Sequence, residues 1–305
     1  MSRAQRVVVT GANGQVGVDL IDTLAGIRTP GASATFEPDG RMVDSREFEV
    51  LALSHHELDI TADEAVRRSI SNVRPDVVVN LAAYTAVDRA ESDEANCFAV
   101  NASATGFLSQ ACQSVGAHFI TVSTDYVFDG QKGAGYVEDD GTGPLNVYGS
   151  TKLAGEQLCA PGDTIVRTSW VMGVRGRNVL HVIASRAAQN ERVRFVKDQR
   201  GTATFAADLA RALVTLIRER PGGLWHVANI GDATWYDIAR YAGDVLEQGP
   251  DFVTAIATNE LDPAPPAARP ARSDLLIDKW CGAGWEPLPG WRDGVERLLA
   301  ARAEL

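Results

Sequence analysis

The stretch RVVVTGANGQVG, residues 6–17, places three evenly spaced glycines directly after a short apolar run. The apolar run predicts a buried strand, and the amphipathic stretch 15–25 predicts a helix beginning within the glycine pattern. Glycines at such a turn let the backbone approach a ligand closely, and the helix N-terminus attracts phosphates. A simple glycine-rich turn is the alternative, but the position between strand and helix favours a dinucleotide site. The expected contacts are Gly11, Asn13, Gly14, Gln15, Val16 and Gly17.

Short apolar runs and helix-length amphipathic stretches continue to alternate along the chain. Residues 76–81, DVVVNL, are almost continuously apolar, which suits a strand covered on both faces of a parallel sheet. We therefore predict an α/β fold: a Rossmann-type doubly wound parallel sheet over 1–166, with a smaller substrate-binding lobe over 167–305. A helix near 206–220 is expected to return to the first unit. The predicted strands are 7–9, 51–53, 77–80, 119–123 and 164–167, and the predicted helices are 15–25, 62–72, 95–115, 150–158, 178–190, 206–219, 235–247 and 291–303.

Composition narrows the classes of partner. The 305 residues are 45% apolar and 23% charged, which is typical of a folded globular chain. A net charge of −11 argues against a nucleic-acid partner, because proteins that bind phosphate backbones concentrate Lys and Arg. The first apolar run is too short for a signal sequence or a membrane span, so we expect a cytoplasmic protein with no membrane partner. Four separated cysteines without a CxxC pair signal neither a zinc site nor a redox pair.

Two stretches depart from the alternating pattern. Residues 26–45 hold three glycines, two prolines and no apolar period, which predicts a long exposed loop. Residues 262–273 hold four prolines and predict a stiff, extended segment that ends in Arg269, Arg272 and Ser273. This segment is either a surface linker or the edge of a lid that brings an arginine to a phosphate.

The end of the second predicted strand bears on the choice of cofactor. An acidic residue at this place hydrogen-bonds the ribose 2′-hydroxyl of NAD. Here the strand ends in LSHH, residues 53–56, with no carboxylate at the tip, so nothing repels a 2′-phosphate and Ser54 or His55 can donate to it. NADPH is therefore favoured, with NADH as the alternative. Asp59, followed by Ile60, is either an adenine contact or a turn residue.

Tyr148 and Lys152 stand four residues apart in YGSTK, so on a helix both project from one face. A phenol with an ordinary pKa of ~10 is a poor acid at neutral pH, and a nearby ammonium favours its ionised form. The pair can therefore act as a tuned general acid, with a surface Tyr and Lys as the alternative. The strand 119–123 leads into Thr124 and Asp125, where Thr124 can polarise the same carbonyl or serve turn chemistry.

Five motifs together resemble those of one known family. GANGQVG, VNLAAYTAVDRAESD, VSTDYVFDG, PLNVYGSTKLAGE and VRTSWV occur in the order seen in dTDP-4-dehydrorhamnose reductases, which are extended short-chain dehydrogenases. The resemblance runs nearly end to end. It implies reduction of the C4 ketone of a dTDP-linked 6-deoxy-4-keto sugar by hydride from the nicotinamide, which yields activated L-rhamnose. A monomer or homodimer is expected.

The resemblance also implies roles for single residues. Ala82 and Ala83 are expected against the cofactor, with close helix–strand packing as the alternative. Asn101 is expected near the catalytic lysine or as a buried structural residue, and Trp170 at the sugar or in the core. Some members hold Mg²⁺ at a subunit contact, and Asp19 occupies one such place, but no full ligand set is identified and Mg²⁺ is left open. The other implied residues are Tyr84, Tyr148 and Lys152 at the cofactor, Thr124, Tyr148 and Lys152 in catalysis, and Thr85, Val87, Thr124, Asp125 and Tyr126 at the substrate.

Three other functions fit parts of the same pattern. A sibling 4-ketoreductase of a secondary-metabolite pathway would use identical chemistry and differ only in the stereochemistry of its product. A catalytically idle relative would keep the fold to bind a partner enzyme, although the retention of Thr124, Tyr148 and Lys152 speaks against it. A nucleotide-sugar epimerase or dehydratase would share the loop and the Tyr–Lys pair but would retain NAD tightly.

Overall fold

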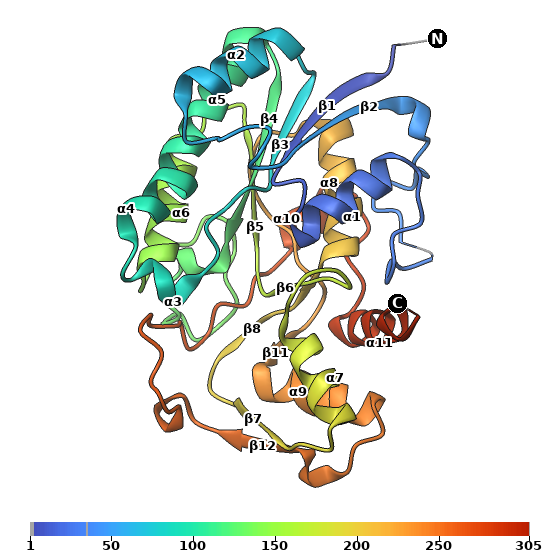
Figure 1. The fold of residues 1–305 in the computed structure, drawn as a ribbon, viewed down its shortest axis with the longest axis vertical. Helices are drawn as coiled ribbons and strands as arrows, with labels where there is room; N and C mark the ends of the chain where they lie inside the picture. Colours follow the sequence, from blue (N-terminus) through green and yellow to red (C-terminus); the bar gives the residue numbers. More distant parts are fainter. Residues whose placement is uncertain (1–2, 35, 305) are drawn as a thin grey trace.

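A six-stranded sheet forms the centre of the larger part of the molecule, with helices on both faces (Figure 1). The computed structural model describes residues 3–34 and 36–304. All neighbouring strands are parallel, in the order β10-β5-β4-β3-β1-β2. This confirms the predicted doubly wound α/β class. The strands are β1 (Gln5–Thr10), β2 (Phe48–Leu53), β3 (Val77–Asn80), β4 (His118–Thr124), β5 (Thr164–Thr168) and β10 (Gly223–His226).

Strands β1 and β3 are apolar throughout because both faces of the sheet are covered. Val7 and Val9 join the core beneath α1 (Gln15–Leu24) and α8 (Ala206–Glu219), whereas Val8 joins the core beneath the opposite helices. Those opposite helices are α2 (Asp63–Val73) and α5 (Ala104–Val115). The helix α8 has the predicted bounds and packs beside α1. The remaining helices of this part are α3 (Val87–Ala90), α4 (Glu94–Phe98), α6 (Val147–Gln157) and α10 (Asp278–Gly282).

The second part of the molecule lies below the carboxyl ends of the large sheet in Figure 1. It gathers three helices and three short strand pairs around a separate apolar cluster that includes Trp291 and Phe205. Among the described residues, no helix combines the length and apolarity needed to cross a membrane. The elements are α7 (Val179–Ala188), α9 (Trp235–Val245) and α11 (Trp291–Ala303), with the pairs β6 (Val171–Met172) and β9 (Thr204–Phe205), β7 (Val193–Val196) and β12 (Val253–Ile256), and β8 (Arg200–Thr202) and β11 (Asp232–Thr234).

Two predicted helices differ from those observed. The helix predicted over 95–115 is present, but a π-helical turn at Ala99–Ser103 joins its two α-helical parts, α4 and α5. Such turns often occur at functional sites, and this one contains Asn101. The helix predicted at 150–158 begins three residues earlier, because the Asn146 side chain accepts a hydrogen bond from Gly149 N at 2.7 Å and caps the helix. Tyr148 therefore lies on α6.

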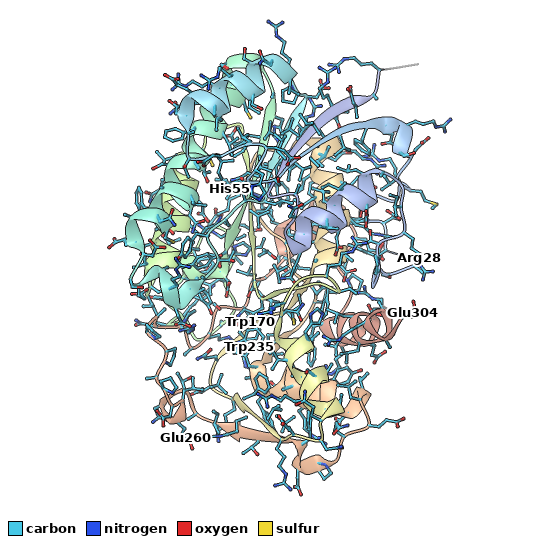
Figure 2. All side chains as sticks on the ribbon, viewed as in Figure 1. Arg28, His55, Trp170, Trp235, Glu260 and Glu304 are labelled. Carbon is cyan, nitrogen blue, oxygen red and sulfur yellow. The ribbon has the colours of Figure 1, made fainter. Side chains whose placement is uncertain are left out.

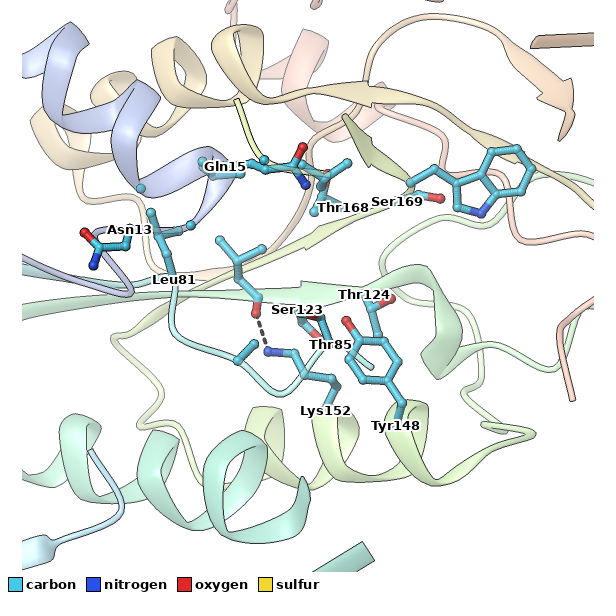
Figure 3. Close-up of a pocket in the computed structure, with 18 residues that line it drawn as sticks. Asn13, Gln15, Leu81, Thr85, Ser123, Thr124, Tyr148, Lys152, Thr168 and Ser169 are labelled. Carbon is cyan, nitrogen blue, oxygen red and sulfur yellow. Dashed lines mark hydrogen bonds between the residues drawn. The ribbon is translucent and has the colours of Figure 1, made fainter. Parts of the chain in front are cut away.

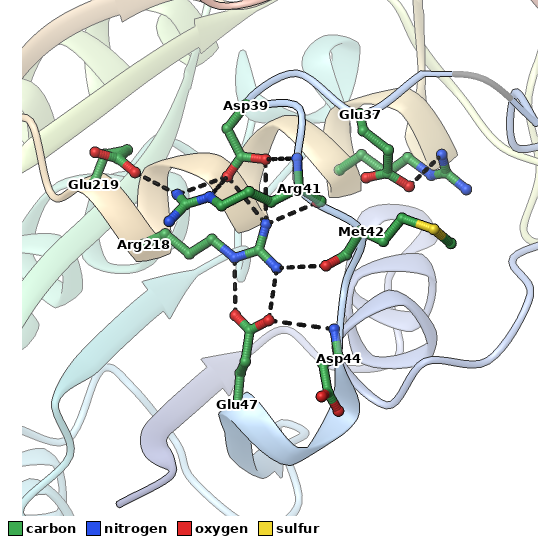
Figure 4. Close-up of polar contacts among 9 residues, drawn as sticks. Glu37, Asp39, Arg41, Met42, Asp44, Glu47, Arg218 and Glu219 are labelled. Carbon is green, nitrogen blue, oxygen red and sulfur yellow. Dashed lines mark hydrogen bonds and ion pairs between the residues drawn. The ribbon is translucent and has the colours of Figure 1, made fainter. Parts of the chain in front are cut away.

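The stretch 26–45 is not the exposed loop that its composition predicts. Phe36 is 2% exposed, and Arg218 of α8 binds the loop through Asp39 and through the backbone oxygens of Arg41 and Met42 (Figure 4). The guanidinium also pairs with Glu47 at 3.0 Å. Thr35, which the loop prediction includes, lies outside the described residues. The remainder of the loop is fixed to α8 by charge pairs that composition alone does not reveal.

Candidate active site

A cavity of about 510 Å³ opens at the carboxyl ends of β1, β3, β4 and β5 (Figure 3). This edge of a doubly wound sheet is where such folds bind their ligands. A second cavity, of about 540 Å³, lies toward β2 and shares Asn13, Gly14, Leu81 and Ala83 with the first. We call them the catalytic cavity and the β2 cavity. Together they bring residues of the glycine loop (residues 11–17), residues at the carboxyl ends of the strands and residues of α6 to one edge of the sheet.

The glycine loop is shaped for close approach of the backbone. Gly11 has a φ of +68°, and a Cβ atom there would stand 2.5 Å from the backbone N of Ala82. Only glycine fits such a position. Gly14 caps α1 without a side-chain hydrogen bond, which leaves the first N–H groups of that helix to meet an anion. The loop therefore fits a dinucleotide pyrophosphate, as its sequence predicts.

Gln15 connects this loop to the second part of the molecule. Its side-chain oxygen accepts hydrogen bonds from Gly173 N at 2.9 Å and from Asn178 Nδ2 at 3.0 Å. Both donors belong to the segment that joins β6 to α7. Gln15 also lines the catalytic cavity, together with the predicted Val16 and Gly17.

The three predicted catalytic side chains lie together in the catalytic cavity. Tyr148 and Lys152 project from α6, and Thr124 stands at the end of β4 beside the phenol of Tyr148 (Figure 3). The ammonium of Lys152 donates to the backbone oxygen of Val122 at 2.6 Å. A phenol, a hydroxyl and an ammonium therefore surround one space where a carbonyl oxygen could sit.

Burial shifts the pKa values of both Tyr148 and Lys152. It raises the pKa of the Tyr148 phenol, which Thr124 counteracts by hydrogen bonding. Burial also lowers the pKa of Lys152 to about 8, against the opposing effect of the Glu156 carboxylate. The prediction that the ammonium lowers the phenol's pKa is thus not met, because desolvation of the phenol raises that pKa. Tyr148 is a protonated donor at neutral pH.

Asn101 is hydrogen-bonded to the neighbour of Lys152 in the chain, Thr151, and not to Lys152 itself. Its amide oxygen accepts from Tyr84 N at 2.9 Å, and its amide nitrogen donates to Tyr84 O at 3.1 Å and to Thr151 Oγ1 at 3.1 Å. It therefore ties the segment after β3 to the residue beside Lys152. Neither Asn101 nor Tyr84 lines the two cavities, whereas Ala83 lines both and Ala82 lines the β2 cavity.

The predicted substrate residues divide into two groups. Thr85 and Thr124 line the catalytic cavity, as does Trp170, but Val87, Asp125 and Tyr126 do not. Asp125 is buried behind Thr124 and accepts from the Ser273 hydroxyl at 2.5 Å, and burial raises the pKa of this carboxyl to about 6. Tyr126 packs edge-on against Tyr148, with ring centroids 6.0 Å apart. Asp125 and Tyr126 thus support the residues that line the cavity.

Trp170 combines the two roles that its sequence position left open. It lines the catalytic cavity, and its ring stacks on that of Trp235 with centroids 3.9 Å apart (Figure 2). Its φ is +45°, an unusual value for a residue with a large side chain. The indole Nε1 is buried with no hydrogen-bond partner. A ligand acceptor would satisfy it.

At the end of β2, the prediction that no carboxylate reaches the tip is wrong. Glu57 folds back, and its carboxylate accepts hydrogen bonds from both the backbone N and the hydroxyl of Ser54. Periodicity could not show this, because the return of the side chain depends on the turn Ser54–Glu57. Ser54, Asp59 and Ile60 line the β2 cavity as expected. Asp59 also accepts from Thr61 N at 3.0 Å.

Asp19, the residue considered for Mg²⁺, lies beside an arginine. Within residues 3–34 and 36–304, no three His, Cys, Asp or Glu side chains gather where a metal ion could be held. Asp19 is 1% exposed and faces Arg175, at 3.7 Å, which also pairs with Asp22 at 2.5 Å. A guanidinium supplies the positive charge at this place.

Comparison with known proteins places the chain in a family. Residues 40–303 match the family model described as the RmlD substrate binding domain. The dTDP-4-dehydrorhamnose reductase of Streptomyces griseus is 41% identical, over 97% of this chain and 93% of that protein. The chain belongs to the dTDP-4-dehydrorhamnose reductase family.

Two further relatives bear on cofactor and substrate. A dTDP-4-keto-6-deoxy-D-glucose reductase of Streptomyces niveus is 35% identical, over 96% of each chain. The crystal structure of dTDP-4-dehydrorhamnose reductase from Bacillus anthracis in complex with NADP is 30% identical, with a TM-score of 0.86 over 97% of this chain and 99% of that one. A member of the dTDP-4-dehydrorhamnose reductase family with the fold described here thus binds NADP.

Several residues that line the cavities in this family member were not predicted. Thr168 is the last residue of β5 and Ser169 follows it, just as Thr124 is the last residue of β4. Because the carboxyl ends of parallel strands meet at one edge, a search for polar residues after every strand would have found them. The other unpredicted lining residues are Leu81, Val122, Ser123, Val171 and Gly176 in the catalytic cavity, and His56, Leu58, Thr61, Asn96 and Val100 in the β2 cavity.

Proposed function

We propose that the protein is an NADPH-dependent oxidoreductase that reduces the C4 ketone of a dTDP-linked 6-deoxy-4-keto-hexose, converting dTDP-4-dehydro-L-rhamnose to dTDP-L-rhamnose. The meeting of Thr124, Tyr148 and Lys152 in one cavity beside the glycine loop carries the proposal. Family membership supports the substrate class, and the NADP complex of the Bacillus anthracis relative supports the cofactor. The protein is proposed to act in the cytoplasm, as a monomer or homodimer.

In this proposal Tyr148 is the general acid. Its phenol stays protonated at neutral pH because burial raises its pKa, so it can give its proton to the oxygen of the substrate ketone as that oxygen gains charge. Thr124 donates a hydrogen bond toward the same oxygen, and charged Lys152 stabilises the phenolate left behind. The nicotinamide, when bound, supplies the hydride.

The remaining predicted contacts belong to the same proposal. The glycine loop and Ala83 hold the dinucleotide, Ser54, Asp59 and Ile60 meet its adenosine end, and Thr85 and Trp170 meet the sugar. The uncapped N-terminus of α1 at Gly14 supports this assignment, since its first N–H groups have no side-chain partner and can meet the pyrophosphate. NADPH is the preferred dinucleotide and NADH the second.

A sibling 4-ketoreductase is the second candidate, and the Streptomyces niveus relative favours it. That protein is a dTDP-4-keto-6-deoxy-D-glucose reductase by name, and its 35% identity is close to the 41% of the Streptomyces griseus enzyme. Both reactions would use the same three catalytic groups. The two candidates differ in which face of the sugar ring meets the cofactor, and therefore in the configuration of the product at C4.

NADPH oxidation with an enzymatically generated dTDP-4-keto-6-deoxy sugar tests the proposal, followed by NMR of the product. Rapid oxidation to dTDP-L-rhamnose supports the proposal. A product with the other configuration at C4 indicates that the protein catalyses the sibling reaction. If NADPH is not oxidised, the result supports the idle, partner-binding alternative. Co-purified oxidised NAD would instead support an epimerase or dehydratase.

The variant Tyr148→Phe isolates the acid. Turnover should fall by roughly 10²–10⁴-fold because the proton donor is lost. The Kd for NADPH should change by less than about twofold, since the phenol hydroxyl is assigned to the ketone. Turnover like that of the unaltered protein would remove Tyr148 from the mechanism.

A further inference from the structure

The turn that follows β2 holds a carboxylate against its own backbone. One oxygen of Glu57 accepts from Ser54 N at 2.6 Å and also from the Ser54 hydroxyl. In return, Glu57 N donates to Ser54 O at 3.1 Å. Both polar hydrogens of Ser54 are therefore directed at one anionic group.

This turn stands at the place that distinguishes the two nicotinamide dinucleotides. In doubly wound folds the residue after the second strand meets the 2′ position of the adenosine ribose. Here Ser54 and His55 line the β2 cavity with Gly11 of the glycine loop, and Figure 2 shows His55 at this edge of the sheet. A 2′-phosphate bound here would need the donors of Ser54, which Glu57 already engages.

We propose that Glu57 sets the choice between NADPH and NADH by competing with the 2′-phosphate for the Ser54 donors. Its negative charge repels a phosphate, whereas its free lone pairs can accept from the ribose 2′-hydroxyl of NADH. The carboxylate thus weakens NADPH binding relative to NADH binding. This inference rests on the proposed function only in requiring that the cavity takes a nicotinamide dinucleotide.

The neighbouring charges give the phosphate little compensation for Glu57. His56 lies close enough to lower the pKa of the Glu57 carboxyl, after the two hydrogen bonds from Ser54, so the carboxylate stays ionised at neutral pH. Glu57 reaches the cavity only through its hydrogen bonds to Ser54, whereas Asp59 places a negative charge in the lining itself. The imidazoles of His55 and His56 are exposed and can donate to a phosphate, which accounts for binding of NADPH in spite of Glu57.

The variant Glu57→Gln removes the negative charge of residue 57 and keeps the size and shape of its side chain. Glutamine keeps an oxygen that can accept from Ser54, so the turn is retained, and Glu57 is exposed, so folding is not at risk. The control is Glu64→Gln, which makes the same charge change on the exposed face of α2, where Glu64 pairs with Arg68. Unchanged melting temperatures in both variants establish that the fold is kept.

The readout is the Kd of NADPH and of NADH, each measured by fluorescence titration without substrate. Glu57→Gln should raise the ratio Kd(NADH)/Kd(NADPH) by roughly five- to tenfold, because the negative charge that engages the Ser54 donors is removed. The gain should shrink as ionic strength rises. A ratio within about twofold of the unaltered protein, or an equal shift in Glu64→Gln, overturns the inference. If neither dinucleotide binds the unaltered protein, the proposed function fails as well.

Discussion

The rate of ketone reduction should depend on pH through the protonation of Lys152. Its ammonium is buried on α6 and donates to Val122 O, and burial lowers its pKa to about 8. The charged form, which is needed to stabilise the phenolate of Tyr148, predominates below that value. The neutral form predominates above it and cannot give this stabilisation.

We expect kcat for ketone reduction to be level from pH 6 to about 7 and to fall toward tenfold per pH unit above about 8. The measurement is the kcat profile at saturating NADPH and substrate. Lys152→Arg is the control, because a guanidinium keeps its charge throughout this range; its residual activity should show no alkaline fall. A level profile to pH 9.5 in the unaltered protein would contradict this role for Lys152.

Among single residues, the sequence predicted those whose role depends on their near neighbours in the chain. The spacing of Tyr148 and Lys152 and the glycines at 11, 14 and 17 follow from the chain itself, and the structure brings these residues together. The place of Glu57 and the burial of Asp125 were not predictable, because each depends on where a side chain or a distant residue such as Ser273 comes to lie. The pKa shifts depend on the same three-dimensional burial.

Among the elements, those with continuous apolarity were predicted well. All five predicted strands lie within β1 to β5; the signal is clearest for β3, whose four residues are buried, and it covers only the second half of the half-exposed edge strand β2. The strand β10 was missed since its four residues include an exposed glycine and a histidine. The π-helical turn was missed because no apolar period marks it, and the hydrogen bonds of its Asn101 to Tyr84 and Thr151 join residues far apart in the sequence.

The loop over 26–45 yields a prediction about stability. Arg218 and Asp39 have side chains only 7% and 6% exposed, so removal of the guanidinium leaves a buried carboxylate with only Arg41 beside it. Arg218→Ala should lower the free energy of unfolding by about 2–3 kcal/mol. Arg46→Ala is the control, because Arg46 is 87% exposed in its pair with Asp44 and should cost less than about 0.5 kcal/mol. Urea denaturation measures both, and equal losses would show that the buried pair does not fix the loop.

The whole molecule is assembled out of chain order. The large sheet takes its edge strand β10 and its covering helix α8 from residues that follow the first strands of the smaller part. Without α8, the face of β1 and β3 formed by Val7, Val9 and Val79 loses much of its apolar cover. The predicted division at 166 and 167 therefore depends on the return of the helix near 206–220 to the first unit, which was part of the same prediction, because α8 and β1 share one apolar core.

A fragment that ends at residue 168 should consequently fail to fold on its own. We expect it to bind a hydrophobic dye strongly and to melt without a sigmoidal transition, whereas the full chain melts cooperatively. The dye experiment and a circular-dichroism melt on both proteins provide the check. A fragment that melts cooperatively and binds NADPH would show that residues 1–168 are an independent domain.

Because α8 and β10 are synthesised late, the order of the elements also affects the chain while it is still on the ribosome. The five strands from β1 to β5 are complete at Thr168, but the sheet is finished only at His226, about sixty residues later. At a synthesis rate of roughly 5–20 residues per second, the nascent chain carries an uncovered apolar face for about 3–12 seconds. During that interval the unfinished sheet is a substrate for chaperones and a hazard for aggregation, so slower translation of residues 169–226 should lower the yield of folded protein.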